Sequence, residues 1–251
     1  MRTIAIANQK GGVGKTTTAI NLGAALAALE KPVLLVDCDA QGNAGRGLGL
    51  EARAPTLYEV LIGNAGIEET IRPTALECLE AVPAGRTLVG AEVEFVGLEG
   101  WQSRLRASLA PVVDRYDTIL LDCPPSLGHL TINALAAADG VLVPLQCEYF
   151  ALEGIKELLN TIRRVQTGLN PQLTIAGILL TMYDERTNLA RDVARDVRTH
   201  FADVVFDTIV PRNVRLAEAP SHGLSVLSYD IRSRGAQAYL ALAREMLSRL
   251  S

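Results

Sequence analysis

One segment near the N-terminus, NQKGGVGKTTT at residues 8–18, limits the possible folds more than any other part of the chain. A short apolar, β-branched run precedes it at 3–8, and an apolar pattern with helical spacing follows it at 16–29. A strand, a glycine-rich loop with Gly-Lys-Thr, and a helix in this order are typical of a loop that binds the phosphates of a nucleotide. The loop departs from the pattern G-x-x-x-x-G-K-[ST] at Gln9, and it carries a second cation at Lys10. The role of that second lysine is not explained by the loop pattern.

The loop predicts a nucleoside triphosphate with Mg²⁺ as ligand. Its glycines let backbone N–H groups turn toward phosphate oxygens, and the following helix directs the positive end of its dipole to the same place. Lys15 is expected to reach the β- and γ-phosphates, and the Thr16 hydroxyl to bind Mg²⁺. Thr17 is expected to donate to the α-phosphate side.

Apolar runs alternate with helical patterns along the whole chain. Because such runs are typical of strands buried on both faces, we predict an α/β fold with a doubly wound, mostly parallel sheet and helices on both faces. A single domain covers 1–251 in this interpretation, and the irregular stretch 45–100 is an elaboration near the ligand-binding edge. In the helix at 187–201, Leu189, Val193 and Val197 are expected to face inward. The expected strands are 3–8, 32–37, 117–122, 140–145, 173–181 and 204–211, and the expected helices include 16–29, 151–166, 187–201 and 234–250.

Three aspartates are placed to act on a bound nucleotide. Asp122 ends the apolar run ILLD, and Asp37 and Asp39 follow another in LLVDCDAQGN. Ligands of such sheets bind beyond the carboxyl ends of the strands. We therefore expect Asp122 to hold the Mg²⁺ shell through water and Asp39 to face the γ-phosphate, with Asp37 as a further possible metal ligand.

Composition and charge limit how the protein could bind nucleic acid and where in the cell it is expected. The chain is 49% hydrophobic and 21% charged with a formal net charge of −4, so any nucleic-acid binding must come from a local basic patch. The four cysteines show no C-x-x-C spacing and are expected to be reduced thiols. No apolar run suits a secretory signal or a membrane span, which predicts a cytoplasmic protein.

Six motifs occur in order between about residue 3 and residue 245: KGGVGKTT, VDCDAQGN, DCPPSLGHLTINAL, QCEYFALEG, TMYDERTNL and VPRNVRLAEAPSHG. Together they resemble the ParA/Soj family of chromosome-partitioning ATPases, which belongs to the deviant Walker A P-loop NTPases. The first strand starts at the beginning of the chain, so the resemblance is to the short type without a preceding DNA-binding domain. It implies an ATPase that hydrolyses ATP to ADP and phosphate with Mg²⁺.

The resemblance also implies residue roles. Lys10 would reach the phosphates held by the partner in a homodimer formed on ATP, and Gly11 must stay small because the two loops approach each other there. Asp39 would position the attacking water, and Asp122 would be the strand-end metal aspartate. One departure is Ala40, where the family has proline. The implied nucleotide ligands are Lys10, Gly11, Gly12, Val13, Gly14, Lys15, Thr16 and Thr17, with Pro211 and Asn213 around the adenine; the implied catalytic residues are Lys10, Lys15 and Asp39.

DNA and protein partners follow from the same resemblance. Arg186 and Arg215 match positions at which the family holds double-stranded DNA nonspecifically. No base-reading pattern is present, so contacts would go to the backbone, and the protein would be associated with the nucleoid. A ParB-like centromere-binding protein is the implied trigger of hydrolysis.

Other classes fit less well. A membrane-cycling cell-division ATPase of the MinD-like type needs a basic amphipathic C-terminal tail, and 234–250 offers Arg244 and Arg249 as basic residues beyond its first position. We expect a packed terminal helix and no stable membrane association. An iron–sulfur reductase needs suitably placed cysteines, and a metabolic ligase on this scaffold needs a second substrate pocket; neither pattern is evident.

Overall fold

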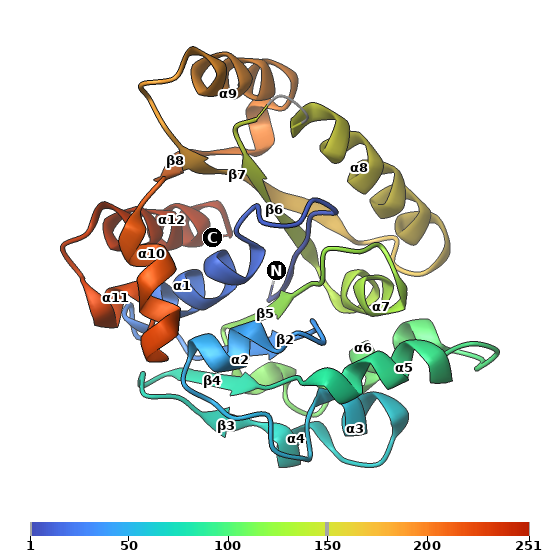
Figure 1. Cartoon of the computed structure of the whole chain (residues 1–251). Helices are drawn as coiled ribbons and strands as arrows, with labels where there is room; N and C mark the ends of the chain where they lie inside the picture. The colour runs from blue at the N-terminus through green and yellow to red at the C-terminus, as the bar shows by residue number, and fades with distance from the viewer. Residues whose placement is uncertain (1, 149–150, 251) are drawn as a thin grey trace.

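The sheet of the computed structural model confirms the predicted α/β architecture (Figure 1). The structure describes residues 2–148 and 151–250; Tyr149 and Phe150, within the motif QCEYFALEG, lie outside the described residues. Eight strands form one sheet in the order β3-β4-β2-β5-β1-β6-β7-β8. All neighbours pair in parallel except β3, which is antiparallel to β4. The strands are β1 (Thr3–Ile6), β2 (Val33–Asp37), β3 (Arg72–Pro73), β4 (Leu79–Val82), β5 (Thr118–Asp122), β6 (Gly140–Gln146), β7 (Thr174–Tyr183) and β8 (Val205–Pro211).

Helices cover both faces of this sheet because its strands are apolar on both sides. In β1, Ile4 and Ile6 enter the core under α1, α10, α11 and α12, whereas Ala5 enters the core under α3 and α5–α9. This alternation is the two-residue period of a strand. The helices are α1 (Lys15–Ala27), α2 (Asn43–Gly47), α3 (Leu57–Ile62), α4 (Ile67–Thr70), α5 (Val89–Glu94), α6 (Arg104–Leu109), α7 (His129–Ala137), α8 (Ala151–Gly168), α9 (Asn188–His200), α10 (Val214–Glu218), α11 (Val226–Tyr229) and α12 (Arg234–Leu250).

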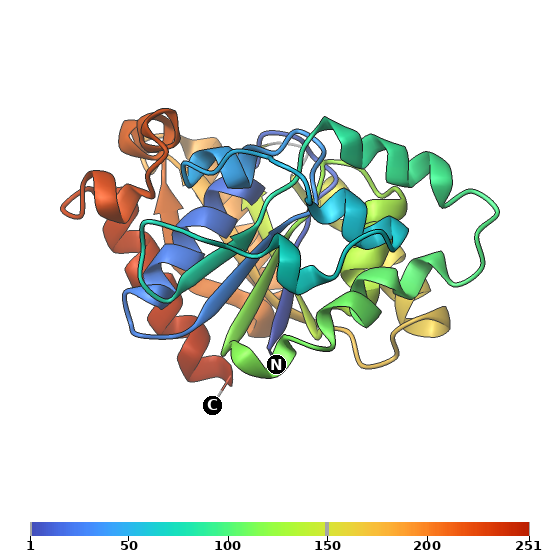
Figure 2. The same cartoon turned by 90° about the horizontal axis from the view of Figure 1, so that it is seen from below.

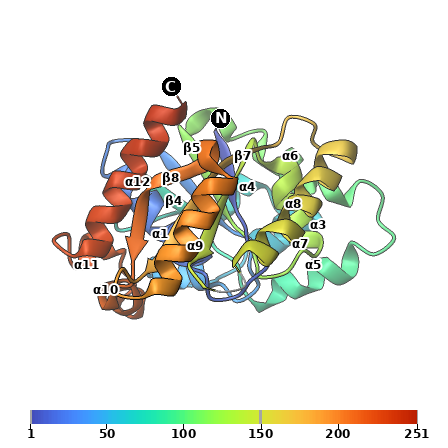
Figure 3. The same cartoon turned by 90° about the horizontal axis from the view of Figure 1, so that it is seen from above.

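The carboxyl ends of the parallel strands define one end of the molecule. Figures 2 and 3 place the loop after β1 at this end, together with α2, α5 and α10, and the N-terminus at the opposite end. The strand order reverses at β1, because β2–β5 lie on one side of it and β6–β8 lie on the other. Ligands of doubly wound sheets bind at such a crossing point.

Two expectations from the sequence need correction. The stretch 45–100 contributes β3 and β4 to the main sheet, so it is more than a surface elaboration. Leu189 was expected to face inward but is 47% exposed. The buried side of α9 consists of Ala190, Val193, Ala194 and Val197, because the apolar stripe includes small alanines rather than the larger Leu189.

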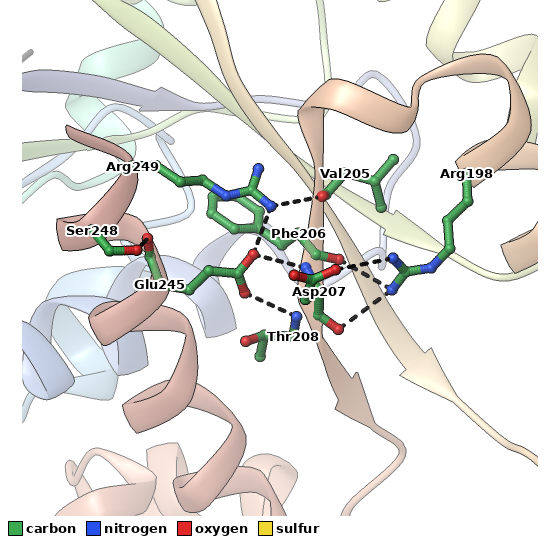
Figure 4. Close-up of polar contacts among 8 residues, drawn as sticks. All are labelled: Arg198, Val205, Phe206, Asp207, Thr208, Glu245, Ser248 and Arg249. Carbon is green, nitrogen blue, oxygen red and sulfur yellow. Dashed lines mark hydrogen bonds and ion pairs between the residues drawn. The ribbon is translucent and has the colours of Figure 1, made fainter. Parts of the chain in front are cut away.

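The edge strand β8 is irregular and is held by side chains (Figure 4). Its register with β7 shifts between the pairs Ile178↔Val205 and Leu180↔Ile209, so residues 206–208 fall outside the regular ladder. Glu245 of α12 accepts hydrogen bonds from the backbone N–H groups of Asp207 (2.7 Å) and Thr208 (2.9 Å). Arg249 donates to the Val205 carbonyl at 2.8 Å, and Arg198 of α9 donates to the Phe206 and Asp207 carbonyls at 3.2 and 3.3 Å. These bonds provide partners for backbone groups that the ladder leaves unpaired.

The C-terminal helix is packed, as predicted. α12 lies against α1 and β8, and it buries Ala236, Tyr239, Leu242, Ala243 and Met246. Within residues 2–148 and 151–250, none of the helices combines the length and the apolar character needed to cross a bilayer.

Candidate nucleotide-binding site

The loop between β1 and α1 is held open by its glycines and anchored to the neighbouring strands. Gly12 and Gly14 have φ values of 75° and 91°, in the left-handed region that favours glycine. The Asn8 side chain accepts from the Lys10 N–H at 3.0 Å and donates to the Pro144 carbonyl at 2.8 Å. The Thr181 hydroxyl donates to the Val13 carbonyl at 2.8 Å. The loop is therefore anchored to both β6 and β7.

Lys15 lies at the first turn of α1 and is only 7% exposed. Its Nζ donates to the carbonyl of Lys10 at 3.0 Å. Burial lowers the pKa of this amine, while the nearby carboxylates of Asp122 and Asp39 act in the opposite direction. An anionic ligand in the loop would add charge that favours the protonated amine.

Asp122 is fully buried, and both of its carboxylate oxygens lack a hydrogen-bond partner among the described residues. Asp122 is the register partner of Asp37, which ends the neighbouring strand β2. Burial raises the pKa of Asp122 well above its usual value, the charge of Asp37 adds to the rise, and the Thr16 hydroxyl opposes it. A buried carboxylate without partners is costly unless a cation compensates it. The Asp122 oxygens beside the Thr16 hydroxyl and the Lys15 amine thus suit a Mg²⁺ ion and its water shell.

Asp37 has a different environment. Its carboxylate accepts backbone N–H groups from Asp39 at 3.1 Å, Ala44 at 3.0 Å and Gly45 at 3.1 Å. Burial raises the pKa of Asp37 to about 7, although these hydrogen bonds act to lower it. The bonds fix the loop that carries Asp39 and the start of α2, so Asp37 organises the segment. Its predicted role as a metal ligand stays a prediction.

Two adjoining cavities are lined by most of the predicted nucleotide residues, whereas Lys10 and Val13 line neither cavity. The first has a volume of about 330 Å³ and brings together Lys15, Thr16, Thr17 and Asp39 with the loop glycines. The second has a volume of about 210 Å³ and is lined by Pro211 and Asn213, with an apolar wall that includes Val210, Leu216 and Tyr239. Gly14, Thr17 and Met182 line both cavities. A polar chamber that opens beside a smaller apolar one matches the phosphates and base of a nucleotide in shape and polarity.

Several lining residues were not predicted. Gln41, Asn43 and Pro125 line the phosphate-sized cavity, and Met182 and Arg212 line the base-sized one. These residues belong to the motifs VDCDAQGN, DCPPS, TMYDERTNL and VPRNV, and within the last two the resemblance implies roles only for Arg186, Pro211, Asn213 and Arg215. Because these motifs lie at strand ends, their remaining residues could also have been expected to line the site.

Lys10 points away from this chamber toward the loop after β6. Its Nζ forms an ion pair with Glu148 at 2.6 Å, and the Gln146 side chain donates to the same carboxylate. Glu148 was another residue that the sequence did not single out.

Of the two predicted DNA-binding arginines, Arg186 lies in the loop between β7 and α9, and Arg215 lies in α10, which follows β8. The Arg212 N–H donates to the Tyr183 carbonyl at 3.1 Å and so links the end of β7 to the start of the segment that follows β8. Arg186 is 83% exposed on its side chain and binds Asp184 at 2.6 Å. Arg215 is 49% exposed and pairs with Glu218 at 2.7 Å and Asp230 at 3.4 Å. Exposed ion pairs of this kind are weak, so other anions can compete for both guanidinium groups.

Two solved structures are similar to this one, and one of them holds a nucleotide analogue and magnesium. Over the whole chain, the structure is similar to cobyrinic acid a,c-diamide synthase from Mycobacterium smegmatis with bound ATP analogue and magnesium (TM-score 0.87, 38% identity, 96% of that chain). It is also similar to the cell division ATPase MinD from Pyrococcus furiosus (TM-score 0.83, 26% identity, 100% of this chain and 99% of that one).

Relatives found by sequence have a higher identity to this chain than these two solved structures. The chromosome partitioning protein ParA of Myxococcus xanthus is 56% identical over 250 residues, which cover 99% of this chain and 88% of the relative. The sporulation initiation inhibitor protein Soj of Bacillus subtilis is 54% identical over 247 residues, 98% of each chain. A family model described as an AAA domain matches residues 1–175.

The glycine loop between β1 and α1, with buried carboxylates at the ends of the adjacent strands, defines a P-loop nucleoside triphosphatase, and Lys10 in that loop makes it one of the deviant Walker A type. Relatives with more than half of their residues identical over nearly the full length narrow this class further. The chain belongs to the ParA/Soj family of chromosome-partitioning ATPases.

Proposed function

We propose that this chain is a Mg²⁺-dependent ATPase that dimerises on ATP, binds nucleoid DNA without sequence preference, and is released when a ParB-like partner stimulates hydrolysis. The observation that carries the proposal is the buried, unpartnered Asp122 carboxylate beside Thr16 and Lys15. The relatives named as chromosome-partitioning proteins support the biological role.

Separate residues of this chain would bind the metal ion, bind the phosphates and orient the attacking water. Thr16 and, through water, Asp122 would hold Mg²⁺, which neutralises phosphate charge. Lys15 binds the β- and γ-phosphates. One oxygen of Asp39 accepts the Gln41 N–H at 2.9 Å, while the other has no hydrogen bond among the described residues and can orient water.

The proposed dimer places two nucleotides between two chains, with Lys10 of each chain serving the phosphates of the other. A cation supplied across the interface neutralises charge that develops during hydrolysis. Gly11 supports this arrangement because no contact or backbone angle in the described part of the chain requires glycine at this position. Its φ lies outside the left-handed region, and an added Cβ would meet only Pro125, at 4.0 Å.

Gly11→Val should therefore bind ATP as a monomer with an affinity within a few-fold of the parent, but should not dimerise. Gly11 is exposed and an added Cβ meets only an ordinary contact with Pro125, so we expect the branched side chain to extend toward solvent in the monomer and to obstruct the approach of a second loop. Sedimentation with a nonhydrolysable ATP analogue measures the dimer, and calorimetry measures nucleotide binding. Gly12→Val is the matched control: φ is 75° at this position, so the substitution strains the loop and should weaken nucleotide binding itself. Normal dimerisation of Gly11→Val would contradict the arrangement.

Arg186→Glu and Arg215→Glu should each weaken DNA binding by the ATP-bound dimer and leave dimerisation intact. Nonspecific binding has a Kd of about 10⁻⁴ to 10⁻⁶ M at physiological salt, and each lost phosphate contact lowers the log–log salt slope by about one. Because a dimer carries each arginine twice, the slope should fall by about two per substitution. Arg53→Glu is a matched control, since Arg53 is 81% exposed and pairs with Glu51 two residues away, as Arg186 pairs with Asp184. Binding unaffected by both reversals would place the DNA surface elsewhere.

A mobility assay with unrelated duplexes tests the proposed function as a whole. We expect binding with Mg²⁺ and ATP or its analogue, strong weakening by salt, and little binding with ADP. Flotation with anionic vesicles separates this function from a MinD-like membrane cycle. An ATP-bound dimer that floats with vesicles and binds no DNA would favour the membrane cycle.

A further inference from the structure

Lys10 and Glu148 form an ion pair that closes the phosphate loop against the end of β6. The Lys10 Nζ lies 2.6 Å from the Glu148 Oε2, and the two residues are 138 positions apart in sequence. Both side chains are partly exposed, at 37% and 46%. The contact therefore joins two loops on the surface where the chain would meet a second copy.

The backbone of Lys10 is fixed independently of this ion pair. Its N–H is bound by the Asn8 side chain, and its carbonyl accepts from Lys15 at 3.0 Å. The carboxylate of Glu148 is in turn held by the Gln146 side chain. The backbone of Lys10 is thus held at both its N–H and its carbonyl, while its ammonium group is held by Glu148.

We propose that Glu148 is a positioning residue that holds Lys10 within its own chain until the triphosphate of a second copy replaces it. This inference rests on the proposed function, in which Lys10 serves the nucleotide bound by the partner. With its charge paired in the monomer, Lys10 offers no unpaired cation at that surface in the absence of a partner. Dimerisation then requires a ligand with more negative charge than one carboxylate, which ATP supplies with its γ-phosphate.

The strength of the contact sets the size of the effect. A partly exposed ion pair shifts an equilibrium by about two- to fivefold, because water screens it. Two such pairs must open for each dimer. Removing both should lower the dissociation constant of the nucleotide-bound dimer by roughly fivefold or more. Nucleotide binding by the monomer should not change, since Glu148 does not line the nucleotide cavities.

Glu148→Gln tests the proposal in the full-length chain. Glutamine keeps the size of the side chain and its bond with Gln146 but cannot hold an ammonium ion. Sedimentation equilibrium with a nonhydrolysable ATP analogue should show a dimer about fivefold tighter than the parent's, and calorimetry at low protein concentration should show unchanged analogue affinity. Glu157→Gln is the matched control: it removes the same charge from an exposed position on α8 and should behave as the parent.

A dimer of Glu148→Gln that is as weak as the parent's, or weaker, overturns the proposal; a weaker dimer would assign Glu148 a direct contact with the partner. In a Lys10→Ala background, followed at higher protein concentration, Glu148→Gln should have no effect. A shift that persists there would indicate general charge repulsion and also overturn the proposal. If the parent itself shows no analogue-dependent dimer, the proposed function fails; if the parent dimerises and Glu148→Gln matches it, only this inference fails.

Discussion

Replacing Lys15 with alanine should abolish tight ATP binding, with a loss of affinity of about 100-fold or more. Lys15 is the buried cation of the phosphate-sized cavity, and the charges of Asp122 and Asp39 act on it directly. Without its amine, those carboxylates would repel the phosphates with less compensation. Isothermal titration calorimetry with Mg-ATP measures the change, and equal affinity in variant and parent would refute the assignment of the loop.

Lys31→Ala is a suitable control for this experiment. Lys31 follows α1, the helix that Lys15 begins, and its partly exposed amine pairs with Asp117 at 3.4 Å. The substitution removes the same charge at the end of the helix remote from the loop. It should leave ATP affinity unchanged, and thermal unfolding of both variants shows whether either has lost its fold.

Asp39→Ala should bind ATP and dimerise while turnover falls by about 10²- to 10⁴-fold. Asp37 holds the Asp39 N–H at 3.1 Å and the start of α2, so the loop should keep its path when the Asp39 side chain is removed. Only the oxygen available to orient water is lost. Phosphate release measures turnover, and sizing chromatography with Mg-ATP measures the dimer.

Two outcomes would contradict this role for Asp39. Hydrolysis at the parental rate would show that another group orients the water. A variant that stays monomeric with Mg-ATP would show that Asp39 supports assembly rather than the chemical step. Asp37→Asn should differ from both, because its carboxylate holds three backbone groups and its loss should displace the whole segment.

The sequence predicted the central strands and long helices because their patterns are local. Uninterrupted apolar runs predicted the ends of β1, β2, β5 and β6 to within one or two residues. The strand LEAV at β4 is only four residues long and includes Glu80, so its pattern is too short to separate from a loop. Leu189 was placed on the wrong side of α9 because the alanines that complete the buried stripe carry little apolar signal.

The parts of the candidate site that follow directly after a predicted strand could be predicted from the sequence. The glycine loop and the aspartates that end β2 and β5 meet because parallel strands bring their carboxyl ends together. The Lys10–Glu148 pair and the position of Met182 beside the glycine loop join segments more than 130 residues apart in sequence, and no local pattern in a single sequence encodes such contacts. The carboxylates beside Arg186 and Arg215 are near in sequence, but their pairing depends on loop conformation.

The side chains on β8 have a consequence for how copies of this chain can assemble. A bare edge strand recruits further strands from other molecules and leads to continuous, hard-to-reverse aggregates. Here Glu245, Arg249 and Arg198 occupy backbone groups of 205–208 at one edge, while the other edge is the two-residue β3 with Arg72 and Pro73. Neither edge is a ready template for growth of the sheet. We therefore expect any ordered array of this protein to be built through side-chain surfaces rather than by extension of the sheet.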